Sequence, residues 1–334
     1  MHKYIHFLDD IHPDYLQSVE DFVREWESAS DRMIVRTSGS TGTPKEIELL
    51  KTDMERSARR TGKFFNFEKG KNLLLNLSPN FIAGKMMIVR AIIHEMNLIV
   101  APLNSNPLLA IKDLDDPIHF GAFVPSQINS IVKDPISKEV YEKIDQVIIG
   151  GARLSPALTT KLQLLRNESF ATFGMTETIT HFALANLSAG EQIYECLPGF
   201  SVSVNEDNCL IVHDEDLGTA YQTNDVVDLK TQQTFHWLGR ADNVINSGGI
   251  KIYPEELEKI FGDVIKGRYY FTSKTHADLG EAVVLVIEGN SFNQEDLRYQ
   301  EKLRGLPKYY RPKEILFQPK FDETKNGKII RKRF

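Results

Sequence analysis

Short apolar runs alternate with longer segments of helical periodicity, and this alternation restricts the possible fold more than any other feature of the chain. The runs have the length of buried strands, and the longer segments have apolar residues at helical spacing. The clearest runs are 72–77, 98–101, 146–149 and 170–173, and the clearest helical segments are 52–65 and 156–165. Such alternation predicts an α/β domain with a largely buried sheet.

The pattern changes after residue 209. Brief β-like runs at 210–212, 226–229 and 234–238 predict a small antiparallel β unit. A glycine loop follows, then a helix at 254–261 that opens with proline and two glutamates, and a strand at 281–288. We therefore expect a large N-terminal α/β domain over residues 1–241, which includes the antiparallel unit, and a small mobile α+β C-terminal domain over residues 242–334.

Composition excludes several classes of protein. A chain of 334 residues with 41% hydrophobic and 26% charged side chains can bury one large core or two ordinary cores, which excludes disorder. The formal net charge of −6 gives no electrostatic reason to expect a nucleic-acid or anionic-membrane partner. Cys196 and Cys209 form neither a disulfide framework nor a zinc motif. With no signal peptide and no uninterrupted apolar segment of membrane length, the sequence predicts a cytoplasmic protein without membrane insertion.

The strongest single motif is a run of small hydroxyl residues and glycines between Arg36 and Glu46. Its residues are Thr37, Ser38, Gly39, Ser40, Thr41, Gly42, Thr43, Pro44 and Lys45. Such a run leaves room for backbone N–H groups and hydroxyls around phosphate oxygens, and Lys45 adds a positive charge. It is not a Walker A loop, because two residues separate Gly42 from the lysine. A flexible surface turn is the alternative, but a turn does not explain ordered hydroxyls that end in Pro-Lys.

This run resembles the phosphate-loop signature of the adenylate-forming (AMP-binding, acyl-CoA synthetase) superfamily. Five further segments follow in the order of that family: Gly150-Gly151-Ala152, Phe173-Gly174-Met175-Thr176-Glu177, Tyr221 to Asp225, Gly239 to Asp242 with Ser247 to Ile252, and Asn326-Gly327-Lys328. The resemblance covers about nine-tenths of the chain and begins after a shorter N-terminal region than familiar members have. It implies an AMP-forming acid–thiol ligase that uses ATP, Mg²⁺ and CoA.

Several matched residues also have a direct chemical interpretation. Glu177, beside Thr176 in a loop after an apolar run, offers Mg²⁺ a carboxylate oxygen, although a surface glutamate is the alternative. Asp225 can accept hydrogen bonds from two ribose hydroxyls, and Arg240 can donate to ribose or phosphate oxygens. An ordinary surface ion pair is the alternative for these two residues. The resemblance assigns ATP and AMP binding to the phosphate loop, to 150–152 and to Phe173 and Gly174.

Lys328 lies in a strongly basic chain end, so a solvated basic tail is its alternative interpretation. The resemblance implies that Lys328 enters the active site and stabilises the charge that develops as a carboxylate attacks the α-phosphate. It also implies that the C-terminal domain rotates between adenylation and thioester formation. Asp242 matches the hinge position, and Gly248, Gly249 and Lys251 match the loop that serves CoA.

The segment 78–90 bears on the acid substrate. In o-succinylbenzoate:CoA ligases of menaquinone biosynthesis, the equivalent segment resembles His-x-Ser-Gly followed by an arginine that faces the aromatic carboxylate. Here Ala83 and Gly84 replace Ser-Gly, and Arg90 keeps the spacing. Because Arg90 lies in an apolar helical run, it needs an anionic partner. That partner is either a protein carboxylate, such as Glu95, or a carboxylate of the ligand.

Three functions are compatible with these features, and an o-succinylbenzoate:CoA ligase is the one that we expect. The second is an adenylating enzyme for another aryl or short acyl acid, with transfer to CoA or to a carrier-protein thiol. The third is a nucleotide-binding module without catalysis, which would not require Lys328. We expect no attached carrier domain after Phe334, which favours a free thiol such as CoA and leaves a carrier in trans open. The oligomeric state stays open as well.

Overall fold

The computed structural model describes residues 3–36, 46–189, 192–323 and 329–334. The chain divides into two compact units. The first unit comprises residues 1–154, 160–201 and 214–219, and the second comprises 155–159, 202–213 and 220–334. Asp242, the hinge position that the sequence suggests, lies inside the second unit, and its role as a hinge stays a proposal.

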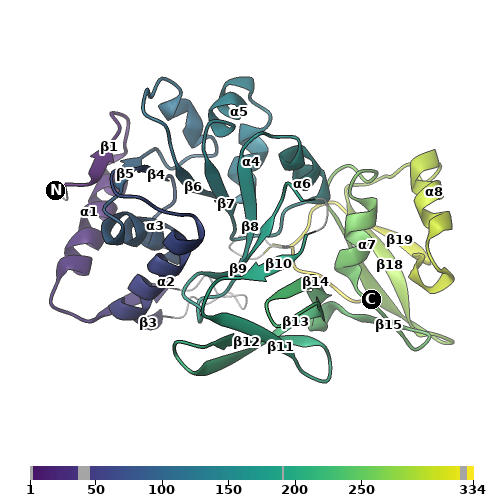
Figure 1. The fold of residues 1–334 in the computed structure, drawn as a ribbon. Helices are drawn as coiled ribbons and strands as arrows, with labels where there is room; N and C mark the ends of the chain where they lie inside the picture. Colours follow the sequence, from purple (N-terminus) through teal and green to yellow (C-terminus); the bar gives the residue numbers. More distant parts are fainter. Residues whose placement is uncertain (1–2, 37–45, 190–191, 324–328) are drawn as a thin grey trace. The chain divides into compact units, whose positions relative to one another are not determined.

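A mixed sheet forms the centre of the first unit, with six parallel strands in the order β1, β5, β4, β6, β7, β8 and two antiparallel strands, β9 and β10, after them (Figure 1). The bounds are β1 (Ile5–Phe7), β4 (Asn72–Leu75), β5 (Asn97–Val100), β6 (Phe120–Phe123), β7 (Gln146–Ile149), β8 (Glu168–Gly174), β9 (His181–Asn186) and β10 (Tyr194–Cys196). All residues of β4 and β6 are buried, as is typical of parallel strands covered on both faces. The strands predicted from continuous apolar runs are confirmed.

Helices lie between these strands in the sequence, and residues 156–159 of α6 belong to the second unit. Their bounds are α1 (Pro13–Glu27), α2 (Lys51–Phe64), α3 (Ile82–Ile93), α4 (Pro125–Ile131), α5 (Pro135–Tyr141) and α6 (Pro156–Gln163), with a 3₁₀ turn η1 (Pro107–Ile111). Helix α3 contacts α2, β4 and β5, and its residues from Gly84 to Ala91 are buried all round. An apolar residue on nearly every face of α3 explains this burial. Strands β2 (Arg32–Arg36) and β3 (Glu46–Leu50) form a separate antiparallel pair.

The strand order creates a switch point between β4 and β6. Strand β5 follows β4 in the chain and pairs with one side of it, whereas β6 pairs with the other side. The connections therefore diverge at the carboxyl end of β4. In open α/β sheets, ligands bind beyond the carboxyl ends of the strands at such a point. The loops that leave β4, β6, β7 and β8 all lie at this edge, because these strands are parallel.

The second unit contains antiparallel strands and two helices. Most residues of β11 (Phe200–Val204), β12 (Cys209–Asp214), β13 (Thr219–Leu229) and β14 (Thr234–Arg240) belong to it, and these strands lie in the order β14, β13, β12, β11. A five-stranded sheet follows, composed of β15 (Ile245–Ser247), β16 (Ile250–Ile252), β17 (Tyr269–His276), β18 (Gly280–Glu288) and β19 (Glu314–Gln318). The predicted antiparallel β unit and the strand predicted at 281–288 are confirmed.

Helix α7 (Pro254–Phe261) has the bounds that its proline and glutamates predict, and α8 (Leu297–Gly305) packs against it. Phe261, Phe271, Leu285 and Tyr299 belong to the apolar core between these helices and the sheet. The turns η2 (Ala241–Asn243) and η3 (Lys308–Tyr310) complete the unit.

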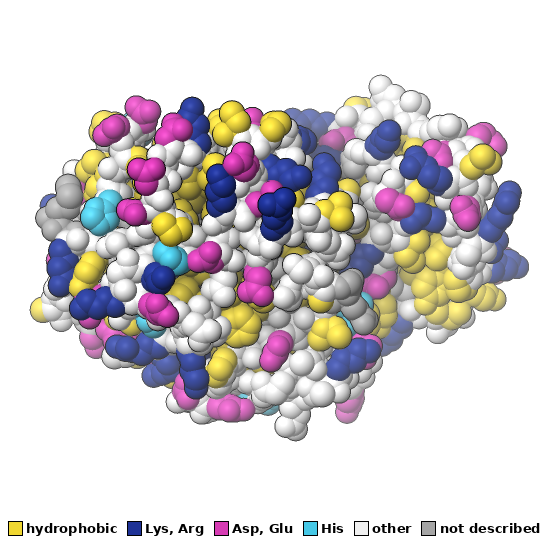
Figure 2. Space-filling view, turned by 45° about the horizontal axis from the view of Figure 1, so that its top comes forward, with side chains coloured by type: hydrophobic (Ala, Val, Ile, Leu, Met, Phe, Trp, Pro, Cys, Tyr) yellow, Lys and Arg dark blue, Asp and Glu magenta, His cyan; other side chains and the backbone are white. Residues whose placement is uncertain are grey.

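The surface agrees with the mixed charge of the sequence. Figure 2 shows acidic and basic side chains interspersed over the face in view. In the described parts of the chain, no helix has the length and apolar character needed to cross a membrane.

Candidate active site

Two glycines follow the carboxyl end of β7. A Cβ atom on Gly150 would lie 2.3 Å from Thr172 Oγ1 of the neighbouring β8, so a larger residue requires the Thr172 side chain to move. Gly151 has φ +85°, in the region that favours glycine. Ala152, the next residue of the predicted nucleotide-binding turn, is exposed. Steric demands therefore account for both glycines, and the turn lies at the sheet edge where ligands are expected.

The loop between β8 and β9 carries Thr176 and Glu177. Thr178 holds the loop, because its Oγ1 lies 3.0 Å from the Met175 carbonyl and 2.7 Å from the Thr180 carbonyl. Ile179 has φ +67°, which is rare for a β-branched residue. Such strained backbone persists where the surroundings enforce it, and it is frequent at functional sites. Glu177 is exposed beside this constrained segment.

Glu177 fits the cation that the resemblance implies. Mg²⁺ usually takes one or two protein carboxylates and completes its shell with water and substrate phosphates. A single exposed carboxylate at the ligand edge of the sheet meets that requirement. In the described ranges, no three His, Cys, Asp or Glu side chains converge on a metal position.

Phe173 and Gly174 end β8 just before this loop. The Phe173 ring lies edge-on to Phe182 and Tyr194, with centroids 5.7 and 5.1 Å away. A Cβ atom on Gly174 would lie 2.2 Å from the Thr180 carbonyl oxygen, so this position also excludes larger residues. The structure thus brings Gly150, Gly151 and the Phe173-to-Glu177 segment to neighbouring strand ends, as the motifs predict.

The chain that leaves β4 enters α3 at the same edge. A Cβ atom on Gly84 would lie 2.2 Å from the Ser78 carbonyl oxygen, so the first turn of α3 packs directly on the preceding loop. Ala83 is exposed. Close backbone packing therefore accounts for Gly84, whereas Ala83 is accessible to a ligand.

Arg90 is the most unusual side chain of the first unit. Only 2% of it is exposed, and its contacts are long: Nη1 lies 3.6 Å from Met87 Sδ, and Nη2 lies 3.4 Å from Thr180 Oγ1. Its Nε has no hydrogen-bond partner among the described residues. Glu95, the protein partner considered from sequence, instead contacts Tyr4 Oη at 2.5 Å and Lys69 Nζ at 2.7 Å. Glu95 is therefore not the partner of Arg90: Arg90 lies in the last turn of α3, whereas Glu95 follows the end of the helix with φ +51° and contacts other residues.

Hydroxyl and imidazole groups surround Arg90. Ser57 Oγ of α2 lies 3.0 Å from Thr180 Oγ1, and Thr61 Oγ1 lies 3.4 Å from His181 Nε2. Burial lowers the pKa of Arg90 to about 9, and burial together with the charge of Arg90 lowers the pKa of His181 well below its usual value. At neutral pH the cluster therefore combines one cation with neutral hydrogen-bonding groups.

This cluster was not visible in the motifs. Ser57 and Thr61 are four residues apart and so share a helix face, which is the only sequence signal that could have indicated them. Thr180 connects Arg90 to the loop that carries Thr176 and Glu177. The predicted acid-binding arginine and the predicted catalytic loop are therefore neighbours within the first unit.

In the second unit, Asp225 and Arg240 are register partners on β13 and β14. Their charged groups lie 3.6 Å apart, and Trp237 Nε1 donates to Asp225 Oδ1 at 2.9 Å. Arg240 also contacts Asp242, at 3.3 Å. The ion pair weighed from sequence is therefore present, and Trp237 orients the carboxylate. The sequence did not reveal Trp237, because its contact depends on strand register.

The predicted thioester loop is the tight hairpin between β15 and β16. Gly248 and Gly249 have φ +59° and +80°, as a two-residue type I′ turn requires. Lys251 contacts Asp207 at 3.3 Å. Asp242 is exposed within η2. The roles of these residues with CoA and as a hinge remain predictions.

The predicted phosphate loop and the predicted catalytic lysine lie outside the residues that the structure describes. The predicted site residues concerned are Thr37, Ser38, Gly39, Ser40, Thr41, Gly42, Lys45 and Lys328. The residues on either side are placed. Arg36 and Glu46 are register partners across β2 and β3, and Glu323 and Ile329 form a β-bridge.

The doubly wound sheet and the glycine and Thr-Glu segments at its ligand edge define an adenylate-forming enzyme. The family profile described as "AMP-binding enzyme" matches residues 13–218, and this chain belongs to that family. Membership of an enzyme family leaves the non-catalytic module without support.

Individual proteins that are similar to this chain are consistent with its family. The chain is similar to the solved structure of an acyl-CoA synthetase (AMP-forming)/AMP-acid ligase II-like protein from Dyadobacter fermentans, with 33% identity, a TM-score of 0.65, and coverage of 95% of this chain and 93% of that one. It is 24% identical over 323 residues to a 2-succinylbenzoate–CoA ligase from Lactococcus lactis, which covers 90% of this chain and 70% of the relative. It is also 23% identical to a 3,4-dihydroxybenzoate–[aryl-carrier protein] ligase from Bacillus anthracis, over 89% of this chain and 71% of the relative.

Proposed function

We propose that this enzyme is an ATP-dependent acid:CoA ligase whose acid is o-succinylbenzoate, also called 2-succinylbenzoate. In the first step, a carboxylate oxygen of the acid bonds to the α-phosphorus of ATP, and pyrophosphate leaves. In the second step, the thiol sulfur of CoA bonds to the acyl carbon, and AMP leaves. The products are o-succinylbenzoyl-CoA, AMP and pyrophosphate.

The observation that carries the choice of acid is the buried Arg90. It is a cation with no carboxylate partner among the described residues, surrounded by neutral hydroxyl and imidazole groups. A buried charge without a partner is costly, and a ligand anion compensates that cost. o-Succinylbenzoate has two carboxylates, so one can react with ATP while the other binds Arg90. The relative from Lactococcus lactis supports this acid.

The remaining residues fit the two steps. Gly150, Gly151 and Ala152 form the adenine-side turn, and Asp225 and Arg240 serve the ribose and phosphates as the resemblance implies. Glu177 would supply a carboxylate oxygen to Mg²⁺, which neutralises phosphate charge when bound. Its loop is held by Thr178, so the carboxylate is positioned before substrate binds.

The phosphate loop 37–45 and Lys328 complete this assignment. Lys328 would stabilise the charge that develops on adenylation. Asp242 would act as the hinge between the two steps, and Gly248, Gly249 and Lys251 would serve the thiol substrate. The β-bridge between Glu323 and Ile329 fixes the chain on both sides of the segment with Lys328.

A second candidate is an aryl-acid adenylating enzyme that transfers to a carrier-protein thiol. The similarity to the aryl-carrier protein ligase of Bacillus anthracis favours it. The acid substrate of this second candidate would also differ from o-succinylbenzoate. A hydroxybenzoate has only one carboxylate, so it would leave Arg90 without an anionic partner.

Acid-dependent exchange of pyrophosphate into ATP, measured over a panel of aryl acids, tests the proposal. We expect o-succinylbenzoate to have the highest kcat/KM. Thioester formation is then measured with CoA and with a phosphopantetheinyl carrier protein. A preference for a mono-carboxylate aryl acid, or transfer only to the carrier, would favour the second candidate.

A further inference from the structure

The basic chain end is an ordered part of the second unit. Phe334 N donates to the Ser273 carbonyl at 3.0 Å, and Thr275 N donates to the Phe334 carbonyl at 3.1 Å, so the end of the chain lies along β17. Its basic side chains have acidic partners: Arg331 contacts Glu258, Lys332 contacts Asp322 and Arg333 contacts Glu281. Residues 329–334 are therefore held against the second unit, although the Lys332 and Arg333 side chains are half-exposed.

Arg333 reaches the turn η2, where the hinge position lies. Its Nη2 donates to the carbonyl oxygens of Asp242 and Val244, at 2.9 and 3.0 Å. Its Nη1 donates to Glu281 Oε1 at 2.9 Å, and Glu281 Oε2 accepts from Asn246 N at 2.7 Å. One guanidinium group thus connects the backbone on both sides of Asn243 to β18.

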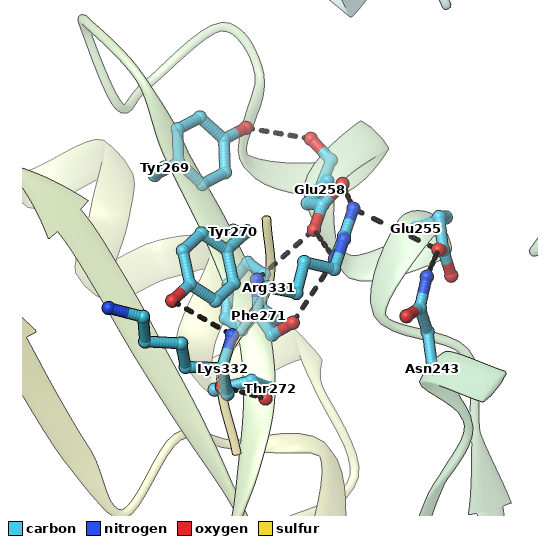
Figure 3. A network of polar contacts seen from close by, with 9 residues as sticks. All are labelled: Asn243, Glu255, Glu258, Tyr269, Tyr270, Phe271, Thr272, Arg331 and Lys332. Atoms are coloured by element: carbon cyan, nitrogen blue, oxygen red, sulfur yellow. Dashed lines mark hydrogen bonds and ion pairs between the residues drawn. The ribbon is translucent and has the colours of Figure 1, made fainter. Parts of the chain in front are cut away.

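A second arginine reaches the same turn indirectly. Arg331 forms a bidentate pair with Glu258, at 2.6 and 2.9 Å, and lies 3.8 Å from Glu255 (Figure 3). Asn243 Nδ2 donates to Glu255 Oε1 at 2.6 Å. The chain end and α7 together therefore contact all three residues 242–244.

Polar contacts restrain one side of this turn. A cleft of about 220 Å³ lies there, lined by Asp242, Asn243, Phe271, Thr272, Arg331 and Arg333. A hinge works by a large change of φ and ψ at a few residues, which also reorients their carbonyl groups. A planar guanidinium group that binds two of these carbonyls therefore favours the φ and ψ angles of one hinge state over those of the other state.

We propose that Arg333 is a positioning residue that holds the turn 242–244 in one of its two hinge states and links it to the chain segment that follows Lys328. The proposal rests on the proposed function, in which the hinge separates adenylation from thioester formation. Loss of Arg333 then destabilises one hinge state and alters the balance between the two half-reactions.

The test compares Arg333→Met, which keeps an apolar stem without donors, with Arg333→Lys, which keeps the charge but not the planar fork. Acid-dependent pyrophosphate exchange reports adenylation, and thioester formation from supplied acyl-adenylate reports the second step. We expect the ratio of the two rates to change about five- to tenfold in Arg333→Met, the size of one typical hydrogen bond at an exposed site. The ratio in Arg333→Lys should lie between the ratio in Arg333→Met and the wild-type ratio. Backbone hydrogen exchange at residues 241–245 should accelerate in Arg333→Met.

Lys332→Met is the matched control, because Lys332 is the adjacent basic residue and its amine contacts Asp322 away from the turn. It should keep the wild-type ratio and the wild-type hydrogen exchange. The proposal is overturned if Arg333→Met keeps the wild-type ratio, or if both half-reactions decline equally with thermal stability. Failure of the proposed function has a different signature, since the wild-type protein would then show no acid-dependent pyrophosphate exchange.

Discussion

Replacement of Arg90 by leucine separates a ligand-binding arginine from a structural one. The wild-type guanidinium is protonated at neutral pH, since its pKa remains near 9, and its contacts to Met87 and Thr180 are long. A ligand carboxylate would replace these weak contacts with a charge-assisted pair. Removing one partner of a desolvated pair costs about 2 to 5 kcal/mol. With roughly 1.4 kcal/mol for each tenfold change, kcat/KM for o-succinylbenzoate should decrease about 30- to 4,000-fold.

The assay is acid-dependent pyrophosphate exchange with o-succinylbenzoate and with the same keto acid lacking the ring carboxylate. Arg90→Leu should affect the mono-acid little or improve it, because no charge is left buried without a partner. For the same reason the ligand-free variant should unfold at the wild-type temperature or above. An equal decrease for both acids, together with a lower unfolding temperature, would refute the reasoning and show that Arg90 supports the fold.

Three further predictions concern single residues. Lys328→Ala should lower adenylation by about 10² to 10³ and spare thioester formation from supplied acyl-adenylate; equal losses in both steps would contradict its assignment. Glu177→Gln should raise the Mg²⁺ concentration needed for half-maximal adenylation, because the amide lacks an anionic oxygen; an unchanged titration would make Glu177 an ordinary surface residue. Burial and the charge of Arg90 lower the pKa of His181, so below about pH 6.5 this imidazole is protonated in the unfolded chain but stays neutral in the folded chain. Its contribution to stability is complete above that pH and declines as the pH decreases below it. His181→Asn should flatten this dependence in urea unfolding measured from pH 5 to 7.5, and identical pH profiles would exclude the effect.

Local signals in the sequence predicted the buried strands, α7 and the glycine turns. Strands β4 and β7 are continuous apolar runs because they are covered on both faces, and α7 begins where proline and two glutamates indicate. The surroundings of Arg90 could not be predicted in this way, because residues 57, 90 and 180 meet only through long-range packing. The contact of Trp237 with Asp225 depends on strand register, and the contacts of Arg333 depend on how the chain end returns to β17.

The pairing of β1 with β5 has a consequence for how the chain folds. Ile5 is the register partner of Leu98, and β1 forms one edge of the sheet. During synthesis, the first strand must therefore stay without its partner until β5 has been made. Pairings between distant segments form slowly, because loop-closure entropy is lost before the contacts compensate it. Until β1 docks, the apolar strand β5 presents an open edge with unpaired backbone groups, which is the kind of surface that promotes aggregation. Once β1 docks, this three-residue strand replaces β5 as the edge of the sheet, and a very short edge strand is one way to limit pairing with other chains.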